Sequence, residues 1–423
     1  MKQQNRLSQT ELSDRELKNR QMASVISILV GVFAISLGFL SCTKQANVDQ
    51  GDMYVIPIQS VFETEHPIKL SEIADTIEYL ELKTPEDLII TGIYKIMSVE
   101  DFLLIEARMI LYKFTQEGDY ICTIGGQGQG PGEYTGVRDF DVDYRSRRIV
   151  IADDGRTHYY DYDGNYLESE KSETINSFAL IDTLKWICED QVQIYPFRYV
   201  VLNANRDTLH TIANPNYGKP SKNAGGVYGY SSPLQRRLYR YQGQLYTKGD
   251  LDEDTVYRVE GIHRIPHIAF DFGSLHLPDH YAAWYDWEAF QKNAMNYWQV
   301  PAVFEDDRYI YATVQRARWD DDGDDFRYVM YDKKERKGFV QKKYAQQKIK
   351  DDILGCIDFW PCFASEEYFY GKIEWYDLQN MLKEGHYTIK PELQKQFDTF
   401  DYGTNQLIIR CKKKNRSGNY TAK

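Results

Sequence analysis

An aromatic hairpin unit recurs along the chain and constrains the fold more than any other feature. Two segments, Ile110 to Ile121 (ILYKFTQEGDYI) and His158 to Leu167 (HYYDYDGNYL), each place an acidic residue and a Gly between aromatic strands. Their turn glycines, Gly118 and Gly164, lie 46 residues apart. Degraded copies follow at Val200 to Leu209 and Tyr328 to Phe339. Such a period is typical of propeller blades, since four short strands with their turns use about 40–50 residues.

The rest of the body also favours strands. Tyr, Phe and Trp make up 14% of the residues, a composition that suits half-buried pleated strands. Roughly 340 residues with insertions divide most naturally into six blades. We therefore predict an all-β fold, a six-bladed β-propeller with short helical insertions. A β-sandwich is the alternative, but it does not explain the recurring unit. The segments with helical periodicity, predicted as insertions, are Asp279 to Gln299, Lys343 to Leu354 and Glu374 to Leu382.

The N-terminus carries an export signal. The run from Ala23 to Ser41 is uncharged and mostly apolar, and Cys42 follows it directly. The pair Ser41-Cys42 looks like the end of the lipobox of a bacterial lipoprotein. An uncleaved signal anchor is the alternative, because 19 such residues can just span a bilayer. The predicted organisation is a signal peptide over residues 1–42 ending at the lipidated Cys42, a tether over 43–53, the propeller over 54–412 and a basic tail over 413–423.

The charge balance excludes one class of partner. The net charge of −12 includes a leader with five basic and three acidic residues, so the remainder carries −14. Nucleic-acid binding needs clustered Lys and Arg to neutralise phosphates, so we expect this acidic chain not to bind nucleic acid. Five cysteines remain beyond Cys42, and two of them, Cys356 and Cys362, are close enough in sequence for a disulfide in an oxidising envelope. Small apolar strand residues are the plainer interpretation of all five.

One motif resembles a known family. Thr123 to Asp143 reads TIGGQGQGPGEYTGVRDFDVD, and the Gly-rich part followed by a DFDVD strand resembles the six-bladed β-propeller lipoproteins of Bacteroidetes, relatives of the NHL-repeat propellers. The resemblance implies a fold and an envelope location without a reaction. Its motif residues, interpreted as structural, are Gly125, Gly126, Gly128, Gly130, Pro131, Gly132 and Glu133.

The Gly-rich loop is interpreted as a connector between blades, where glycines allow positive φ and Pro131 stiffens the exit. A phosphate-binding loop is the alternative. However, the GK[ST] ending of a P-loop is missing and no helical pattern follows directly.

No catalytic or metal site emerges from the residue patterns. The pairs His263/His267 and His276/His280 have helical ligand spacing, but each is interrupted by a proline. The acidic run from Asp320 to Asp325 lacks the order of an EF-hand and is interpreted as a solvated hairpin tip. Neither GxSxG nor SxxK occurs. We therefore predict no cofactor, no metal and no catalytic residue.

Tryptophans supply the remaining candidate contacts. They could stack on sugar rings or on a partner's apolar surface, although core packing is the plainer interpretation. The candidates are Trp284, Trp287, Trp298, Trp319 and Trp360.

The sequence therefore favours an exported, lipid-anchored binding module. Its predicted ligand is an extracellular or periplasmic glycan, peptide or partner protein, bound at the end face of the propeller. The predicted location is the outer membrane. The alternative is a carbohydrate-active or lactonase-like hydrolase or lyase with its site at the mouth of the central channel.

Overall fold

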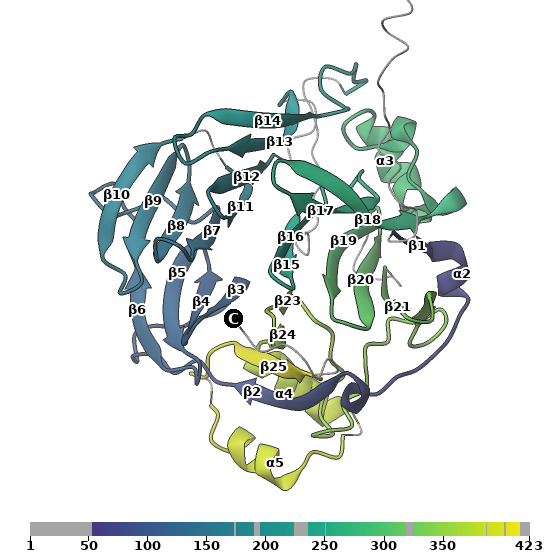
Figure 1. The fold of residues 1–423 in the computed structure, drawn as a ribbon. Helices are drawn as coiled ribbons and strands as arrows, with labels where there is room; N and C mark the ends of the chain where they lie inside the picture. The colour runs from purple at the N-terminus through teal and green to yellow at the C-terminus, as the bar shows by residue number, and fades with distance from the viewer. Residues whose placement is uncertain are drawn as a thin grey trace, which may run out of the picture. The chain divides into compact units, whose positions relative to one another are not determined.

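The computed structural model describes residues 53–172, 175–189, 195–223, 236–249, 251–318, 325–385, 387–401 and 403–414. These residues form six small sheets arranged around a common centre (Figure 1). The fold is a six-bladed β-propeller with short helices, which confirms the predicted fold class.

Each blade is a sheet of consecutive antiparallel strands, numbered from the centre outward. Blade 1 holds β3 (Ile93–Val99), β4 (Phe102–Ala107), β5 (Ile110–Thr115) and β6 (Tyr120–Ile124). Blade 2 holds β7 (Asp139–Asp143), β8 (Arg148–Asp153), β9 (Arg156–Asp161) and β10 (Tyr166–Lys171). Blade 3 holds β11 (Ser177–Ile181), β12 (Leu184–Cys188), β13 (Phe197–Leu202) and β14 (Thr208–Ala213).

The second half of the ring has longer connections. Blade 4 holds β15 (Leu238–Tyr241), β16 (Gln244–Thr247), β17 (Thr255–Glu260) and β18 (His263–Asp271). Blade 5 holds β19 (Trp298–Glu305), β20 (Tyr309–Arg316), β21 (Phe326–Asp332) and β22 (Lys337–Val340). Blade 6 holds β23 (Phe363–Ala364), β24 (Tyr368–Ile373) and β25 (Leu407–Lys413).

The repeated hairpin unit is the outer half of a blade. Its four copies coincide with β5–β6, β9–β10, β13–β14 and β21–β22, as predicted. The turn glycines Gly118 and Gly164 have φ of +88° and +87°, values that a residue with a Cβ rarely adopts. The conformational need of one tight turn therefore explains why Gly recurs at this position.

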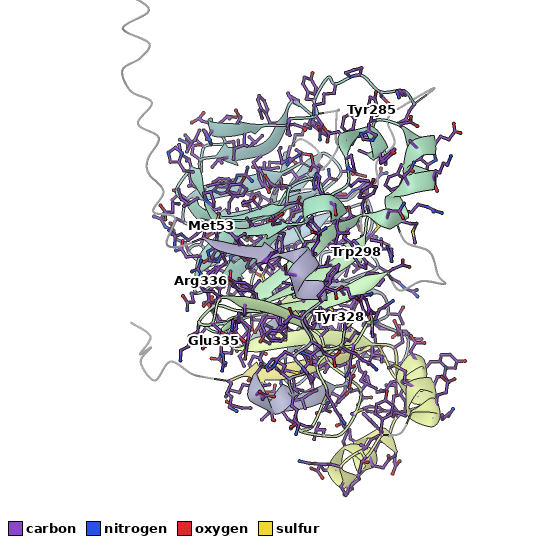
Figure 2. The ribbon with its side chains drawn as sticks, turned by 90° about the vertical axis from the view of Figure 1, so that its right-hand side faces the viewer. Met53, Tyr285, Trp298, Tyr328, Glu335 and Arg336 are labelled. Carbon is purple, nitrogen blue, oxygen red and sulfur yellow. The ribbon has the colours of Figure 1, made fainter. Side chains whose placement is uncertain are left out.

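The N-terminal part of the propeller closes the ring. The strand β2 (Ala74–Leu80) pairs antiparallel with β25 and becomes the outermost strand of blade 6. Before it, β1 (Tyr54–Pro57) adds in parallel to β18, and α2 (Ile58–Phe62) and the turn η1 (Leu70–Glu72) follow. Arg336 in the β21–β22 turn donates a hydrogen bond to the Met53 carbonyl at 2.8 Å (Figure 2). The sheet of blade 6 thus joins an N-terminal strand, β2, to the last strand of the fold, β25.

The apolar core lies between neighbouring blades. Six buried clusters each combine side chains of two adjacent blades, so that the ring has six equivalent interfaces. Strands inside a blade are therefore covered on both faces, and β4 (FLLIEA) is buried at every position. Burial on both faces explains why these strands are apolar runs without a polar alternation.

The predicted helix from Asp279 to Gln299 is wrong in extent. Its helical parts are the turn η3 (Asp279–Tyr281), the helix α3 (Trp287–Asn293) and the turn η4 (Ala294–Asn296). A further turn, η2 (Gly273–Leu275), precedes the segment. Asp286 caps α3 by accepting from the Ala289 N–H at 2.9 Å. From Trp298 onward the chain is β19, buried at all eight positions, because pairing with β20 outweighs the local helical pattern.

Two further helix predictions have different outcomes. Lys343 to Leu354 forms no helix, so that prediction is wrong. The Asp351 carboxylate there accepts hydrogen bonds from the N–H groups of Ile353, Leu354 and Cys356, which replaces helical pairing. The prediction at Glu374 to Leu382 is confirmed by α4 (Trp375–Glu384). The helix α5 (Pro391–Phe397), which was not predicted, packs with α4 against blade 6.

Candidate functional site: the central channel

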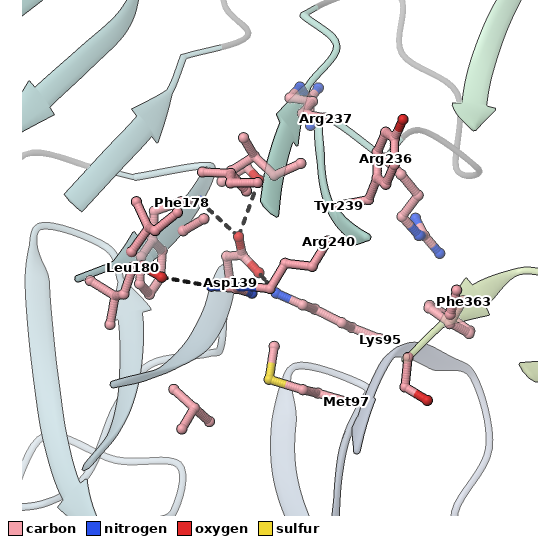
Figure 3. Close-up of a pocket in the computed structure, with 18 of the residues that line it drawn as sticks. Lys95, Met97, Asp139, Phe178, Leu180, Arg236, Arg237, Tyr239, Arg240 and Phe363 are labelled. Atoms are coloured by element: carbon pink, nitrogen blue, oxygen red, sulfur yellow. Dashed lines mark hydrogen bonds and ion pairs between the residues drawn. The ribbon is translucent and has the colours of Figure 1, made fainter. Parts of the chain in front are cut away.

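A cavity of about 900 Å³ runs along the centre of the propeller, and we call it the channel. Its wall comes mainly from the innermost strands of the six blades, β3, β7, β11, β15, β19 and β23 (Figure 3). The volume lies within the range of about 300–1,000 Å³ that is usual for small-molecule sites. The channel is therefore the first candidate binding site.

Two carboxylates of the DFDVD strand cap the inner edge of the next blade. Asp139 accepts from the Phe178 N–H at 2.9 Å, and Asp141 accepts from the Leu180 N–H at 2.6 Å. The two carboxylates are two residues apart on β7, and the two amides are two residues apart on β11. This spacing matches the period of two with which a strand presents one side. The exposed edge of β11 thereby has acceptors for its inward amides.

Basic side chains from two other blades neutralise these carboxylates (Figure 3). Lys95 of β3 lies 2.6 Å from Asp139, and its ammonium also donates to the Phe140 carbonyl. Arg240 of β15 forms two parallel hydrogen bonds to Asp141 at 3.0 and 2.7 Å and a third to the Leu180 carbonyl at 2.8 Å. One network of charge-assisted bonds thus links blades 1 to 4 across the wall of the channel.

Apolar side chains form much of the remaining wall. The aliphatic and aromatic groups come from five blades, so no single strand supplies them. They include Met97, Val142, Phe178, Leu180, Leu238 and Phe363. The channel therefore combines apolar surface with charges that already have partners.

The end of the channel near Arg236 has a different chemistry. The Arg236 guanidinium donates to the Tyr94 carbonyl at 3.1 Å and lies over the rings of Tyr94 and Phe363, at 5.4 and 4.8 Å from their centroids. Nearby, burial raises the pKa of Glu106 to about 7, and the Met109 N–H donates to its carboxyl at 3.2 Å. This carboxyl therefore titrates close to neutral pH.

The lining residues do not form an acid–base pair around open space. No His lines the channel in the described part of the chain. Glu366 accepts from the N–H groups of Gln242 and Gly243, at 3.1 and 2.8 Å, so it holds a turn. Within the described ranges, no group of three or more His, Cys, Asp and Glu side chains is placed to hold a metal ion.

The Gly-rich motif lies in the connection between β6 and β7, which is an inter-blade position. Several of its groups bond within the loop: Gly128 N–H donates to the Tyr134 carbonyl at 3.0 Å, and Gly130 N–H donates to the Glu133 carboxylate at 2.8 Å. Gly125 and Gly132 have positive φ. Because these two amides bond inside the loop, they are not available to cradle a phosphate.

The four described tryptophan candidates are not among the residues that line the channel. Trp284, Trp298 and Trp360 are buried, and Trp287 stacks on Phe290 within the insertion. Trp298, at the start of β19 (Figure 2), packs against Phe62 and lies under the guanidinium groups of Arg316 and Arg327. These surroundings match core packing. Trp319 lies outside the described residues, as do Asp320 to Asp324.

One histidine of each predicted pair has a carboxylate partner of its own. His267 bonds to the buried Glu305 at 3.1 Å, between blades 4 and 5. His276 bonds to Asp254 at 2.8 Å. Each therefore belongs to its own ion pair and not to a shared metal site.

The predicted leader and the lipidated Cys42 also lie outside the described residues. In the described part, no helix is both long and apolar enough to cross a bilayer. The five described cysteines, Cys122, Cys188, Cys356, Cys362 and Cys411, are free thiols, so Cys356 and Cys362 are not joined.

The network of the channel is only partly visible in the sequence. The alternation of Asp139 and Asp141 with apolar neighbours was a usable signal, because charged residues inside an apolar strand need partners. Lys95, Arg236 and Arg240 carry no such signal, since isolated basic residues on strands are common on surfaces. Their roles appear only when the blades meet.

The fold and the channel define the class of this protein: a six-bladed β-propeller with a ligand-sized central cavity. Within that class, the chain belongs to the family described as "Domain of unknown function (DUF4934)", whose model matches residues 53–412.

Comparison with solved structures finds one similar fold and more distant likenesses. A protein from Bacteroides fragilis described as exported is 18% identical and has a TM-score of 0.63. The match covers 86% of this chain and 100% of the B. fragilis protein. The extracellular domain of a one-component system from B. thetaiotaomicron is 11% identical and has a TM-score of 0.36. The match covers 64% of this chain and 30% of that chain. The WD40 domain of Neurospora crassa Pan2 is 10% identical, covers 62% and 71%, and has a TM-score of 0.36. No curated protein matches the chain.

Proposed function

We propose that this chain is an exported lipoprotein that acts as a non-catalytic binding module, and that its channel binds a segment of an extracellular peptide. The observation that carries the proposal is the composition of the channel wall. Aliphatic and aromatic groups lie beside carboxylates and cations that are already paired. Such a wall can bury apolar side chains of a ligand without leaving its own charges unpaired.

Peptide is favoured over glycan at this site by the same chemistry. Met97, Leu180 and Leu238 present aliphatic surface, whereas sugar rings are usually held by exposed aromatic faces and unpaired polar groups. An extended peptide can place apolar side chains against this surface and direct its polar groups toward the paired charges. We therefore expect a ligand with alternating apolar and polar side chains.

The location belongs to the same proposal. The leader with Ser41-Cys42 and the likeness to an exported B. fragilis protein support export and anchoring at the outer membrane. The finer likeness to NHL-repeat lipoproteins rests on the resemblance of the sequence, chiefly at the Gly-rich motif.

The binding proposal is tested by selecting ligands from a displayed random-peptide library on the full chain purified in detergent. Binding of the selected peptide is then measured by calorimetry for Met97→Trp, which fills the channel, and for Met381→Trp, an equally large change on the exposed face of α4. We expect Met97→Trp to weaken binding by at least about tenfold and Met381→Trp to leave it unchanged. A library without binders, or equal affinity in both variants, contradicts the proposal.

The anchor is tested by metabolic labelling of cells with a palmitate analogue. The wild-type chain should carry the label and sediment with membranes, whereas Cys42→Ala should lose the label, because only Cys42 provides the thiol next to the apolar run. A labelled Cys42→Ala variant would rule out lipidation at this residue.

A further inference from the structure

A second cavity of about 490 Å³ lies outside the channel, between the Gly-rich loop and blade 2. We call it the loop cavity. Its walls are Gly128, Gly130 and Glu133 of the loop, and Asp153, His158 and Tyr166 of the strands β8, β9 and β10. The volume is within the range of small-molecule sites, about 300–1,000 Å³. The loop cavity thus joins the motif of the sequence to a space that can hold a ligand.

His158 is the unusual group of this cavity. Its side chain is only 3% exposed, and no described protein atom lies within hydrogen-bonding distance of either ring nitrogen. The Asp153 carboxylate lies 3.6 Å from the His158 Nε2, beyond the ordinary length of a hydrogen bond. Burial lowers the pKa of His158, so the ring is neutral near pH 7 and offers one donor and one acceptor. Buried polar groups are normally satisfied, and this one faces a cavity.

The neighbouring charges are fixed in place. Asp153 is buried and accepts from the N–H and the hydroxyl of Thr135, at 3.0 and 2.5 Å. Hydrogen bonds from Thr135 outweigh the effect of burial and lower the pKa of Asp153, so it stays ionised. Glu133 accepts from Gly130, and Arg156 donates to Ser169 at 3.1 Å. These bonds hold the polar groups at defined positions before a ligand arrives.

The charge balance selects the class of ligand. Asp153 and Glu133 face a single lining guanidinium, that of Arg156, so an anion is disfavoured. Asp154 is paired with Arg138, which does not line the cavity. A metal ion is disfavoured too, because no three-ligand group exists in the described residues. A neutral ligand with several hydroxyls fits, since each hydroxyl can donate to a carboxylate and accept from a ring or guanidinium N–H.

Tyr166 adds an apolar face to these polar groups. It is 38% exposed and lines the loop cavity. A Cβ on Gly132 would come within 2.9 Å of the Tyr166 Cβ, so the loop backbone packs directly against this residue. An aromatic face beside carboxylates is the combination that suits the C–H and O–H surfaces of a sugar ring.

We propose that the loop cavity is a second binding site, for a small neutral polyhydroxylated ligand such as a monosaccharide unit, held by His158, Asp153 and Tyr166 against the Gly-rich loop. The site is separate from the channel and does not depend on the proposed peptide binding. The unit can be a free sugar or the end of a glycan, since both present the same hydroxyls.

The test uses ligand-observed NMR and calorimetry on the full chain in detergent. The probes are glucose, galactose, mannose and N-acetylglucosamine, each also as its methyl glycoside, with inorganic phosphate and calcium chloride as probes of the disfavoured classes. We expect saturable binding of at least one sugar and none of phosphate or calcium. Equal binding of the methyl glycoside would identify a glycan end, and its exclusion a free sugar.

Variants then assign the binding to this cavity. Tyr166→Ala and His158→Leu should each weaken it by at least about tenfold, and His158→Gln should weaken it less, because Gln keeps a donor and an acceptor. Tyr376→Ala, an exposed tyrosine on α4, is the matched control. Met97→Trp should leave sugar binding unchanged, and Tyr166→Ala should leave peptide binding unchanged.

Several outcomes overturn the proposal. If no sugar binds, the cavity holds only water. If phosphate or calcium binds, the proposed class of ligand is wrong. Sugar binding that survives Tyr166→Ala, or that is lost in Met97→Trp, places the ligand elsewhere. Since Tyr166 is exposed, its substitution remains informative even if His158→Leu fails to fold.

Discussion

The buried acidic residues around the channel differ in how well their charge is compensated. Asp141 has a bidentate guanidinium partner, whereas Glu106 has one backbone N–H as its hydrogen-bond donor and lies in a less polar setting. The first carboxylate contributes to the stability of the ring. The second opposes it once it ionises.

Glu106 should make the protein less stable as the pH rises. Its pKa of about 7 in the fold lies above the ordinary value of 4.5 because of burial. The folded state therefore binds more protons than the unfolded state between these values, and stability is fully present below about pH 4.5 and lost as the pH rises through 7. The difference corresponds to about 3 kcal/mol.

Glu106→Gln removes this cost, since Gln still accepts from the Met109 N–H. We expect the variant to be about 2–3 kcal/mol more stable than the wild type at pH 8. Urea denaturation at pH 5 and pH 8 checks the prediction. A gain of the same size at both pH values would show that the titration of Glu106 is not its source.

The Asp141–Arg240 pair should contribute far more than a surface pair of similar geometry. Asp141 is 1% exposed, and Asp141→Asn leaves the partly buried Arg240 without its counter-ion. We expect a loss of about 2–3 kcal/mol, the low end for a buried pair because Arg240 keeps some exposure. Chemical denaturation measures it.

The control is the exposed pair Glu100 and Arg147, which also has two short bonds. Glu100→Gln should cost much less than Asp141→Asn, because solvent screens the exposed pair. Equal losses in the two variants would contradict the importance of the burial of Asp141.

At the scale of elements, ring closure depends on β2. This strand comes from the N-terminal part of the propeller, directly before blade 1, and pairs with the last strand, β25. One sheet therefore joins the N-terminal and C-terminal parts of the ring. Without β2, the outer edge of β25 loses its pairing partner. The core cluster beside blade 6 also loses the buried side chains of Ile77 and Tyr79, which β2 supplies.

A chain that begins at Glu86 should therefore lose cooperative folding. A chain that begins at His66 keeps β2 and loses only β1 and α2, so we expect it to unfold cooperatively at a lower temperature. Near-UV circular dichroism during heating distinguishes the two. A sharp transition in the shorter chain would show that the ring closes without β2.

At the scale of the whole molecule, the blades protect most thiols. Cys188, Cys356 and Cys411 are buried between blades, and only Cys122 and Cys362 have intermediate exposure. Burial also raises the pKa of the Cys122 thiol, which lowers its reactivity.

We expect a thiol reagent to modify at most Cys122 and Cys362 in the folded protein and all five described cysteines after denaturation. Intact-mass spectrometry of protein alkylated before and after denaturation counts the modified thiols. A mass that shows three reactive thiols after unfolding would reveal one disulfide, contrary to the structure.

The sequence by itself determined the architecture of the blades. Strand formation and tight turns depend on neighbouring residues, so Asp163-Gly164 and the aromatic strands around it carry their own structure. The same is true of α4, whose periodicity is local. Six blades follow from the length of one repeat, because the unit is a self-contained sheet.

Only the tertiary structure decided what the segment from Trp298 becomes and which charges meet. β19 is a strand because β20 pairs with it along its length, which outweighs the helical pattern. Arg240 and Asp141 are 99 positions apart, and His158 faces the Gly-rich loop only because blade 2 folds back on its connection to blade 1. Contacts between distant residues depend on the packing of whole blades, and no local pattern in the chain encodes them.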